Sequence, residues 1–220
     1  MTTQNSINRM TSVLKTDSIA SDGYEQFSIA TVNKYRMGID ADDSDSFKIA
    51  YGSSLGVNDY FVMDTDGNLT LPYQPAFFAT MTTSVSSVTG DGTVYTIIQD
   101  VEKYDVGANY NNANGIFTAP VDGYYFLSAA LAYQMGFITG ATYFLQYIKT
   151  TKRNYVLNNL PGRKRVNNFY AVTNTIKTVG SVIANMDAGD TAYHVVEGVG
   201  GLKNGNVYIY TTFLSGFLAT

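Results

Sequence analysis

The sequence predicts an all-β protein. Aromatic residues make up 14% of the 220 residues, with 18 Tyr and 12 Phe, and such residues favour strands. Apolar and polar residues alternate in short runs, as in 35–39 and 47–51, which is the period of a half-buried strand. Clusters of Gly, Asp and Asn separate these runs and indicate tight turns. Only Ile7, Met10 and Leu14 have helical spacing.

The run from Asn109 to Phe126 contains two turns and an aromatic strand. Asn114-Gly115 lies between a polar and an apolar stretch, and both residue types tolerate the positive φ of a tight hairpin turn. Pro120 and Gly123 bracket a second turn before the aromatic strand that begins at Tyr124. Strands with turns at this spacing continue to the C-terminus, where 207–210 and 212–218 are expected as the last pair. This pattern is typical of a sandwich or jelly roll.

Composition excludes several kinds of partner and chemistry. Hydrophobic residues make up 45% of the chain, enough for a core, and charged residues only 15%. The net charge of −4 lacks the strong positive field of a nucleic-acid-binding protein. No cysteine is present, so disulfides, thiolate metal sites and thiol nucleophiles are excluded.

The N-terminal residues lack the pattern of a secretory signal. Met1 to Ser6 contain neither a basic segment nor an apolar one, and no apolar run approaches the length of a membrane span. We therefore expect a soluble chain made without a Sec signal, which would act outside a cell after lysis, on a particle or through a dedicated export route.

Two prolines, Pro72 and Pro75, indicate a connector between two parts. We expect a tail or short helix over 1–20, a β-rich trimeric stalk or collar over 21–74, and a jelly-roll head over 75–220. The strands before the connector are short, and 60–63 is apolar on both faces. So few residues offer one chain little core, which favours several intertwined copies. A small independent β-domain is the alternative.

Residues 75–220 resemble the globular head of complement component one, subcomponent q, whose fold is shared with tumour necrosis factor. The resemblance rests on 75–79, 117–123, 187–190 and 211–218. Its signature positions, which it implies are structural, are Asp105, Tyr110, Phe117, Gly123, Tyr125, Phe213, Gly216 and Phe217. It implies a ten-stranded jelly roll, a tight homotrimer and a recognition function. Gln99, Leu127 and Ala129 depart from the family's aromatic positions.

The N-terminal part has a resemblance of its own. Residues 35–40, 45–49 and 64–70 resemble the short β-repeats of phage tail-fibre and tail-spike shafts. There is no Gly-X-Y repeat, so the stalk is not collagen.

Catalytic and metal patterns are sparse. His194 lies beside Val195 and Val196 with no Gly-x-Ser-x-Gly motif in the chain, so we interpret it as a structural or interface histidine and expect no enzyme. Asp40 to Asp45 resembles the start of a calcium loop, but Asp45 and Tyr51 stand where an EF-hand needs Gly and Glu. A different Ca²⁺ site stays open; no other cofactor is indicated. Glu102, Asp105 and Asp122 give no defined acid/base pair.

One region combines basic, amide and aromatic residues that could bind a ligand. Lys149, Lys152 and Arg153 form one basic cluster, and 163–165 form a second. Solvated loops, or ion pairs to the neighbouring subunit, are the simpler explanation, and an anion site is the alternative. Amide and Tyr side chains there would suit sugar hydroxyls. The predicted ligand-binding residues are Tyr155, Asn158, Asn159, Arg163, Lys164, Arg165, Asn167, Asn168 and Tyr170.

These observations favour a homotrimeric receptor-binding or structural fibre-tip protein of a phage-like particle, located on the virion. It would bind a cell-surface receptor or glycan by multivalent adhesion. The alternative is a cellular complement-q-like adhesion protein, secreted or at the surface.

Overall fold

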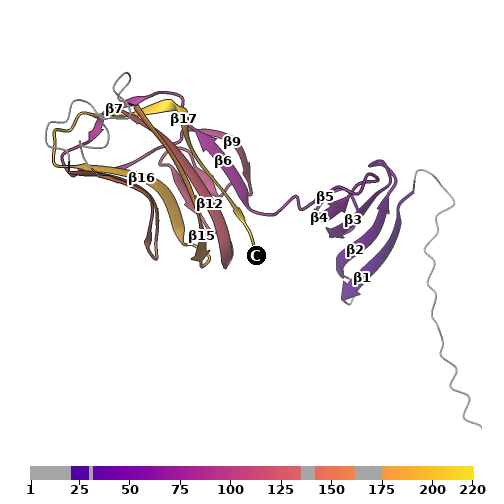
Figure 1. Cartoon of the computed structure of the whole chain (residues 1–220). Helices are drawn as coiled ribbons and strands as arrows, with labels where there is room; N and C mark the ends of the chain where they lie inside the picture. Colours follow the sequence, from indigo (N-terminus) through magenta and orange to yellow (C-terminus); the bar gives the residue numbers. More distant parts are fainter. Residues whose placement is uncertain (1–20, 30–31, 135–141, 162–174) are drawn as a thin grey trace, which may run out of the picture. The chain divides into compact units, whose positions relative to one another are not determined.

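The computed structural model describes residues 21–29, 32–134, 142–161 and 175–220 (Figure 1). The chain divides into two compact units, an N-terminal unit that ends at Tyr73 and a C-terminal unit that begins at Gln74. This division falls between the two prolines of the expected connector. The tail or helix expected for 1–20 lies outside the described residues.

The described part of the N-terminal unit is one antiparallel sheet in which each strand pairs with the next along the chain (Figure 1). Between β2 and β3 the chain reverses through Ser44 and Asp45, whose φ values are 55° and 58°, a region that short polar residues tolerate. The strands are β1 (Gly23–Ile29), β2 (Val32–Asp40), β3 (Ser46–Tyr51), β4 (Asp59–Met63) and β5 (Leu69–Thr70).

The two faces of this sheet differ. Lys48 and Ala50 project from β3 to one face and are buried there, together with Leu55 from the loop between β3 and β4. Tyr51, Met37 and Ile39 project to the opposite face and stay partly exposed. The unit's own chain therefore closes only one face of its sheet.

The C-terminal unit is a sandwich of two antiparallel sheets. One sheet has the order β15-β12-β17-β6-β9, with β7 pairing with β17; the other has the order β10-β11-β16-β13-β14, with β8 pairing with β16. The strands of the first sheet are β6 (Ala76–Thr80), β7 (Val85–Thr89), β9 (Val101–Val106), β12 (Gly123–Gln134), β15 (Thr175–Met186) and β17 (Gly205–Leu218). Those of the second are β8 (Val94–Thr96), β10 (Tyr110–Asn111), β11 (Ile116–Thr118), β13 (Tyr143–Thr150), β14 (Asn154–Pro161) and β16 (Thr191–Val199).

The chain passes repeatedly from one sheet to the other, which confirms the predicted all-β jelly roll. The two main paths hold five strands each, so the ten strands implied by the resemblance are present. The short strands β7 and β8 are additional in the described part of the chain.

Two apolar clusters fill the space between the sheets. One contains Phe77, Phe117, Tyr125 and Leu127, and the other contains Ile97, Leu131, Tyr133 and Phe144. Tyr125 and Leu127 alternate along β12 with Tyr124 and Phe126 on the outer face. The aromatic strand predicted from Tyr124 onward is therefore a central strand of the sandwich.

Strand β14 ends at Pro161, and the second basic cluster, 163–165, lies outside the described residues. One local expectation is wrong. Residues 207–210 and 212–218, expected as a pair of strands, belong to the single long strand β17. Its register shifts against β12 between Ala130 and Ala132, where Thr212 Oγ1 accepts a hydrogen bond from the N–H of Ala132 and donates to the carbonyl of Tyr208. The bulge keeps one strand continuous.

Candidate functional site

Asp105 and Tyr110 have structural roles in the turn that follows β9. The carboxylate of Asp105 accepts hydrogen bonds from the N–H groups of Asn109, at 3.1 Å, and Tyr110, at 2.9 Å. The ring of Tyr110 stacks on Phe77 with centroids 5.0 Å apart. The Asp105 carboxylate therefore closes the turn, and the Tyr110 ring anchors it in the core.

Four more signature residues, Phe117, Gly123, Tyr125 and Gly216, make close contacts within the C-terminal unit. Phe117 stacks on Phe77 with centroids 4.7 Å apart, and the hydroxyl of Tyr125 donates to the carbonyl of Val121. A Cβ on Gly216 would lie 2.6 Å from Cδ2 of Leu127, and one on Gly123 would lie 2.7 Å from the carbonyl O of Thr220. Both glycines are needed because neighbouring atoms occupy the place of a side chain.

His194 lies in a buried polar layer between the two apolar clusters. Along β16 it stands between Ala192 of the first cluster and Val196 of the second. Its ring nitrogens lie 3.2 Å from Nε2 of Gln99 and 3.0 Å from Nε2 of Gln146. All three side chains are fully buried.

The surrounding hydrogen bonds determine which nitrogen of His194 carries the proton. Gln146 Oε1 accepts from Asn158 and Thr178, so its Nε2 must donate both to the Ala129 carbonyl and to Nε2 of His194. The proton of the neutral ring is then on Nδ1. Exchanging the nearly indistinguishable O and N of the Gln99 amide lets Oε1 accept that proton's hydrogen bond and Nε2 donate to the Tyr110 hydroxyl.

This layer holds His194 neutral. Burial lowers its pKa to about 3, and a second ring proton would face an amide N–H₂ of Gln146. The network joins strands of both sheets, from Ala129 on β12 to Asn158 on β14. It therefore supports the structural interpretation of His194, whose ring is fully buried and does not face solvent.

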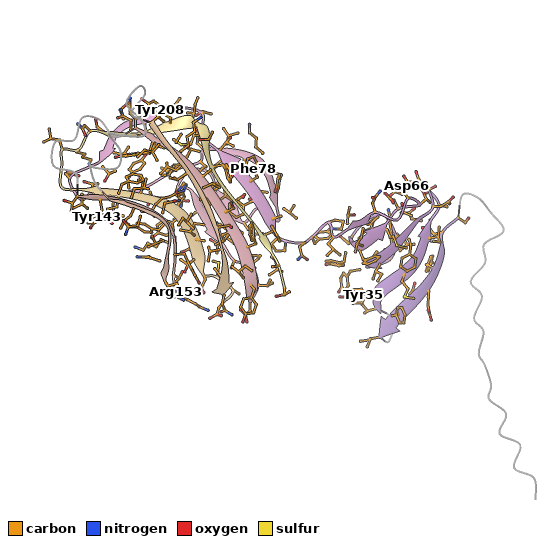
Figure 2. The ribbon with its side chains drawn as sticks, viewed as in Figure 1. Tyr35, Asp66, Phe78, Tyr143, Arg153 and Tyr208 are labelled. Atoms are coloured by element: carbon orange, nitrogen blue, oxygen red, sulfur yellow. The ribbon has the colours of Figure 1, made fainter. Side chains whose placement is uncertain are left out.

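Three of the predicted ligand-binding residues fall within the described part of the chain. Tyr155 packs against the first apolar cluster, with the Arg153 guanidinium carbon 5.3 Å from its ring centroid (Figure 2). Asn158 donates inward to Gln146, as above, while Asn159 is exposed. The other predicted residues, Arg163, Lys164, Arg165, Asn167, Asn168 and Tyr170, lie outside the described residues.

The first basic cluster is largely engaged within the chain. Nζ of Lys152 lies 2.7 Å from a carboxylate oxygen of Asp187 and 3.4 Å from one of Asp190. Hydrogen bonding to Asp187 raises the pKa of Lys152. Nζ of Lys149 lies 5.8 Å from the ring centroid of Tyr193. Lys152 thus forms its ion pairs within its own chain, and no contact to a neighbouring subunit is needed to explain this cluster.

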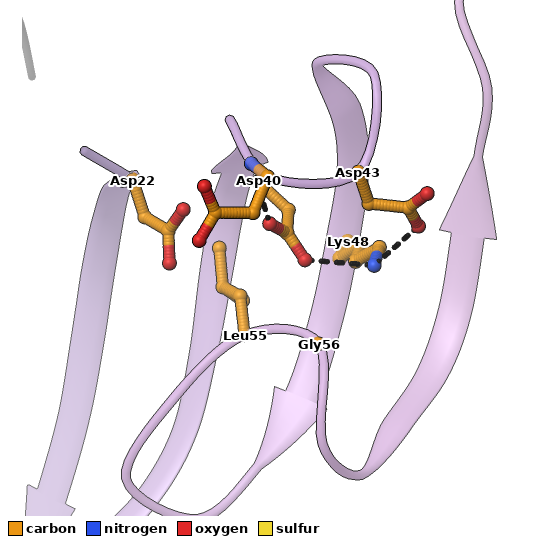
Figure 3. A pocket seen from close by; sticks show the side chains of 7 residues that line it. Asp22, Asp40, Asp43, Lys48, Leu55 and Gly56 are labelled. Carbon is orange, nitrogen blue, oxygen red and sulfur yellow. Dashed lines mark hydrogen bonds and ion pairs between the residues drawn. The ribbon is translucent and has the colours of Figure 1, made fainter. Parts of the chain in front are cut away.

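Asp40 and Asp43 of the Asp-rich segment take part in an ion cluster around the buried side chain of Lys48 (Figure 3). Nζ of Lys48 lies 2.8 Å from Asp40, 2.6 Å from Asp43 and 3.1 Å from Asp59. Burial alone would lower the pKa of Lys48, but hydrogen bonds to these three carboxylates outweigh it and raise the pKa.

The Lys48 ammonium thus occupies the position among the carboxylates that a metal ion would take. Within the described ranges, no group of three or more His, Asp or Glu residues is arranged to hold a metal ion. The pocket beside the cluster is lined by Asp22, Asp40, Asp42, Asp43, Lys48, Leu55 and Gly56.

The outer face of the sheet that contains β12 carries large apolar side chains on either side of a row of three serines, Ser128, Ser181 and Ser215. Phe126 stacks on Phe217 with centroids 5.2 Å apart. Phe78, labelled in Figure 2, packs on Phe213 and Tyr104 with centroids 5.4 and 6.3 Å apart. We call this surface the outer aromatic face; its members are Phe78, Tyr104, Phe126, Val179, Ile183, Phe213 and Phe217. Tyr104, Val179, Ile183 and Phe217 are exposed large hydrophobic residues, so the face is exposed in a single chain.

No protein-family model matches the chain, and no curated protein matches it significantly. Among solved structures, the globular domain of zebrafish complement 1qA is similar over 67% of this chain and 98% of that chain, at 14% identity and a TM-score of 0.44. Murine APRIL at pH 8.0 is similar over 66% and 98%, at 11% identity and a TM-score of 0.43. Eiger TNF from S. frugiperda is similar over 68% and 94%, at 12% identity and a TM-score of 0.43.

The complement and tumour necrosis factor structures bear the names of the family to which the sequence of residues 75–220 was compared above. The jelly-roll assignment itself rests on the strand pairing of this chain. In the part of the chain that the structure describes, no helix has the length and apolarity of a membrane crossing.

Sequence reasoning missed the partners that complete both polar clusters. Gln146 sits in an otherwise apolar strand, Tyr143 to Ile148, at an inward position, and a polar residue there signals a buried hydrogen-bond network. Lys48, at an inward position of β3 near four Asp residues, carries a comparable signal.

Proposed function

We propose that this chain is a homotrimeric adhesion protein that forms a receptor-binding or structural fibre tip on a phage-like particle. The outer aromatic face is the observation that carries the proposal, because an apolar sheet face of this extent marks a protein–protein interface. In the proposed trimer this face is buried between copies. Residues 21–74 form the stalk and residues 75–220 form the head.

The mechanism is multivalent binding. Three sites held on one rigid trimer engage a cell surface together and reach avidities about 10²–10⁴ above that of one site. We place the ligand surface around β14 and residues 163–170, where basic, amide and Tyr side chains suit an acidic or neutral glycan. Asn159, exposed on β14, supports this choice.

Assembly through the outer aromatic face is tested with a charge. Ile183 on that face is 61% exposed, and Val156 on β14 is 57% exposed. We expect Ile183→Lys to raise the protein concentration below which light scattering shows the full chain falling from the mass of three chains, because one of its interfaces is weakened. The matched Val156→Lys should leave that concentration unchanged, and equal dissociation concentrations for the two variants would remove the outer aromatic face from the proposed interface.

Ligand binding is tested with a glycan array and with intact cells. The trimer should bind in a saturable manner without releasing a product, and Arg163→Ala with Arg165→Ala should weaken binding at unchanged native mass. Lys203→Ala, at an exposed position in the loop before β17, is the control. Release of sugar products would instead indicate an enzyme, and binding unaffected by the double variant would place the ligand surface elsewhere.

A further inference from the structure

The sheet of the N-terminal unit has an apolar face built from three cross-strand rows. Alternation along the strands and their register place these side chains on the same side. We call this surface the stalk face. Its rows are Phe27, Tyr35 and Tyr51; then Met37, Ile49 and Phe61; then Ile39, Phe47, Met63 and Leu69.

The stalk face is ordered within each chain but open. Tyr35 packs edge-on against Tyr51, with centroids 5.3 Å apart, and Phe47 against Phe61, at 6.2 Å. Glu25, paired with Met37, is the one charged side chain in these rows. Apart from Glu25 and the hydroxyls of Tyr35 and Tyr51, this surface offers a polar partner no group to pair with, so a partner that covers the whole face must be largely apolar.

The unit has almost no core of its own. Among its described residues, the buried hydrophobic side chains are Ala50 and Leu55. Both lie on the side of Lys48, away from the stalk face. A unit of this size does not fold stably on so small a core. The missing apolar burial must therefore come from a partner that is present whenever the chain folds.

The exposed area is sufficient for a specific interface. The seven most exposed side chains of the stalk face keep between about a third and about a half of their area. At ~200 Å² for each large side chain, this is on the order of 600 Å² per chain. Two such faces would bury roughly 1,200 Å², above the ~1,000 Å² that a biological interface needs.

We propose that the stalk face packs against the same face of further copies of this chain and forms a shared core with them. A second copy is the one partner present in fixed ratio at folding, and its face is as apolar as the face that it covers. Cyclic symmetry turns the same face of every copy inward. The inference deepens the proposed homotrimeric function and rests on it; it adds a second interface independent of the outer aromatic face.

Single-cysteine variants of the full chain test the proposal, because the chain contains no cysteine. Met37, in the stalk face, is 36% exposed, and Val57, in the loop on the other side, is 68% exposed. We compare the rate of thiol alkylation in Met37→Cys and Val57→Cys, each relative to its own rate in denaturant. Met63→Cys, in another row, repeats the measurement.

In a single chain the exposed fractions predict about a twofold difference in alkylation rate. We expect Met37→Cys to react more than about tenfold slower than Val57→Cys, since a thiol in an interface is shielded. A bis-maleimide should link Met37→Cys chains to one another but leave Val57→Cys chains separate. Dilution below the assembly concentration should restore reactivity at position 37.

Two results would overturn the inference without touching the proposed function. The first is a twofold ratio in a protein whose native mass is that of a trimer, because assembly would then occur through the C-terminal unit alone. The second is protection that persists on dilution without cross-links, because the face would then be covered by its own chain. A monomeric native mass would overturn both proposals.

Discussion

The N-terminal and C-terminal units place opposite kinds of groups at their buried centres. Beneath the N-terminal sheet lies an ammonium, Lys48, among three carboxylates, and its apolar side chains are on the open face. The C-terminal sandwich buries two apolar clusters with a neutral polar layer between them. We infer that the C-terminal unit holds its fold from within, whereas the N-terminal unit depends on neighbouring copies.

The largest expected effect is at Lys48. Lys48→Met removes the ammonium and leaves the buried carboxylate of Asp40 unpaired, which costs about 3–5 kcal/mol when one partner of a buried ion pair is lost. Hydrogen exchange resolved by peptide should show faster exchange in β2 and β3, with the sandwich strands unchanged. Equally faster hydrogen exchange in both units would contradict the claim that the two units are stabilised separately.

Acid should weaken the C-terminal unit through His194. Its pKa is about 3 when folded and about 6.5 when unfolded. The unfolded chain therefore binds the extra proton first, and stability falls as pH falls below about 6.5. Between pH 7.5 and pH 5 this amounts to about 2 kcal/mol. Denaturant titrations at both pH values should show this loss in the free energy of unfolding. His194→Gln, which has no imidazole to protonate, should lose about 2 kcal/mol less than the unsubstituted chain over the same pH range. An equal loss in both proteins would refute the assignment of the pH effect to His194.

A smaller effect is expected from added bulk in the sandwich. A Cβ at Gly216 would lie 2.6 Å from Leu127 and 3.0 Å from Phe77, so Gly216→Ala should cost about 1–2 kcal/mol through overpacking. Gly189→Ala is the control without a clash, since no atom lies within 4 Å of its Cβ position, although its φ of +90° adds strain. If Gly189→Ala lowers the melting temperature more than Gly216→Ala does, the close contact at Gly216 does not cost the stability that we expect.

The smallest effect is expected at Lys152. It pairs with Asp187 and Asp190 in solvent, and exposed pairs contribute little. Lys152→Gln should leave the melting temperature of the C-terminal unit nearly unchanged, and a shift as large as that of Gly216→Ala would show that the pair is structural.

The fold was predictable from the sequence because its signals are local. Alternation predicts β2 and β3, and the Asn114-Gly115 turn lies between the paired strands β10 and β11. The missed continuity of β17 depends on a hydrogen bond from Ala132, 80 residues away, to Thr212. No local pattern contains that information.

The polar clusters were less predictable. His194 was interpreted as structural, but its partners Gln99 and Gln146 come from other segments of the fold. The Asp-rich segment suggested Ca²⁺ because its carboxylates are adjacent in sequence, whereas the cation that they bind is the Lys48 ammonium. Which charges meet is decided by strand register and not by composition.

The central claim is that this chain assembles into a homotrimer, and native mass in solution tests it most directly. Light scattering on the full chain, over a hundredfold range of concentration, should give three times the mass of one chain. A mass of one chain at every concentration would contradict the account, because both apolar sheet faces would then lie open to water.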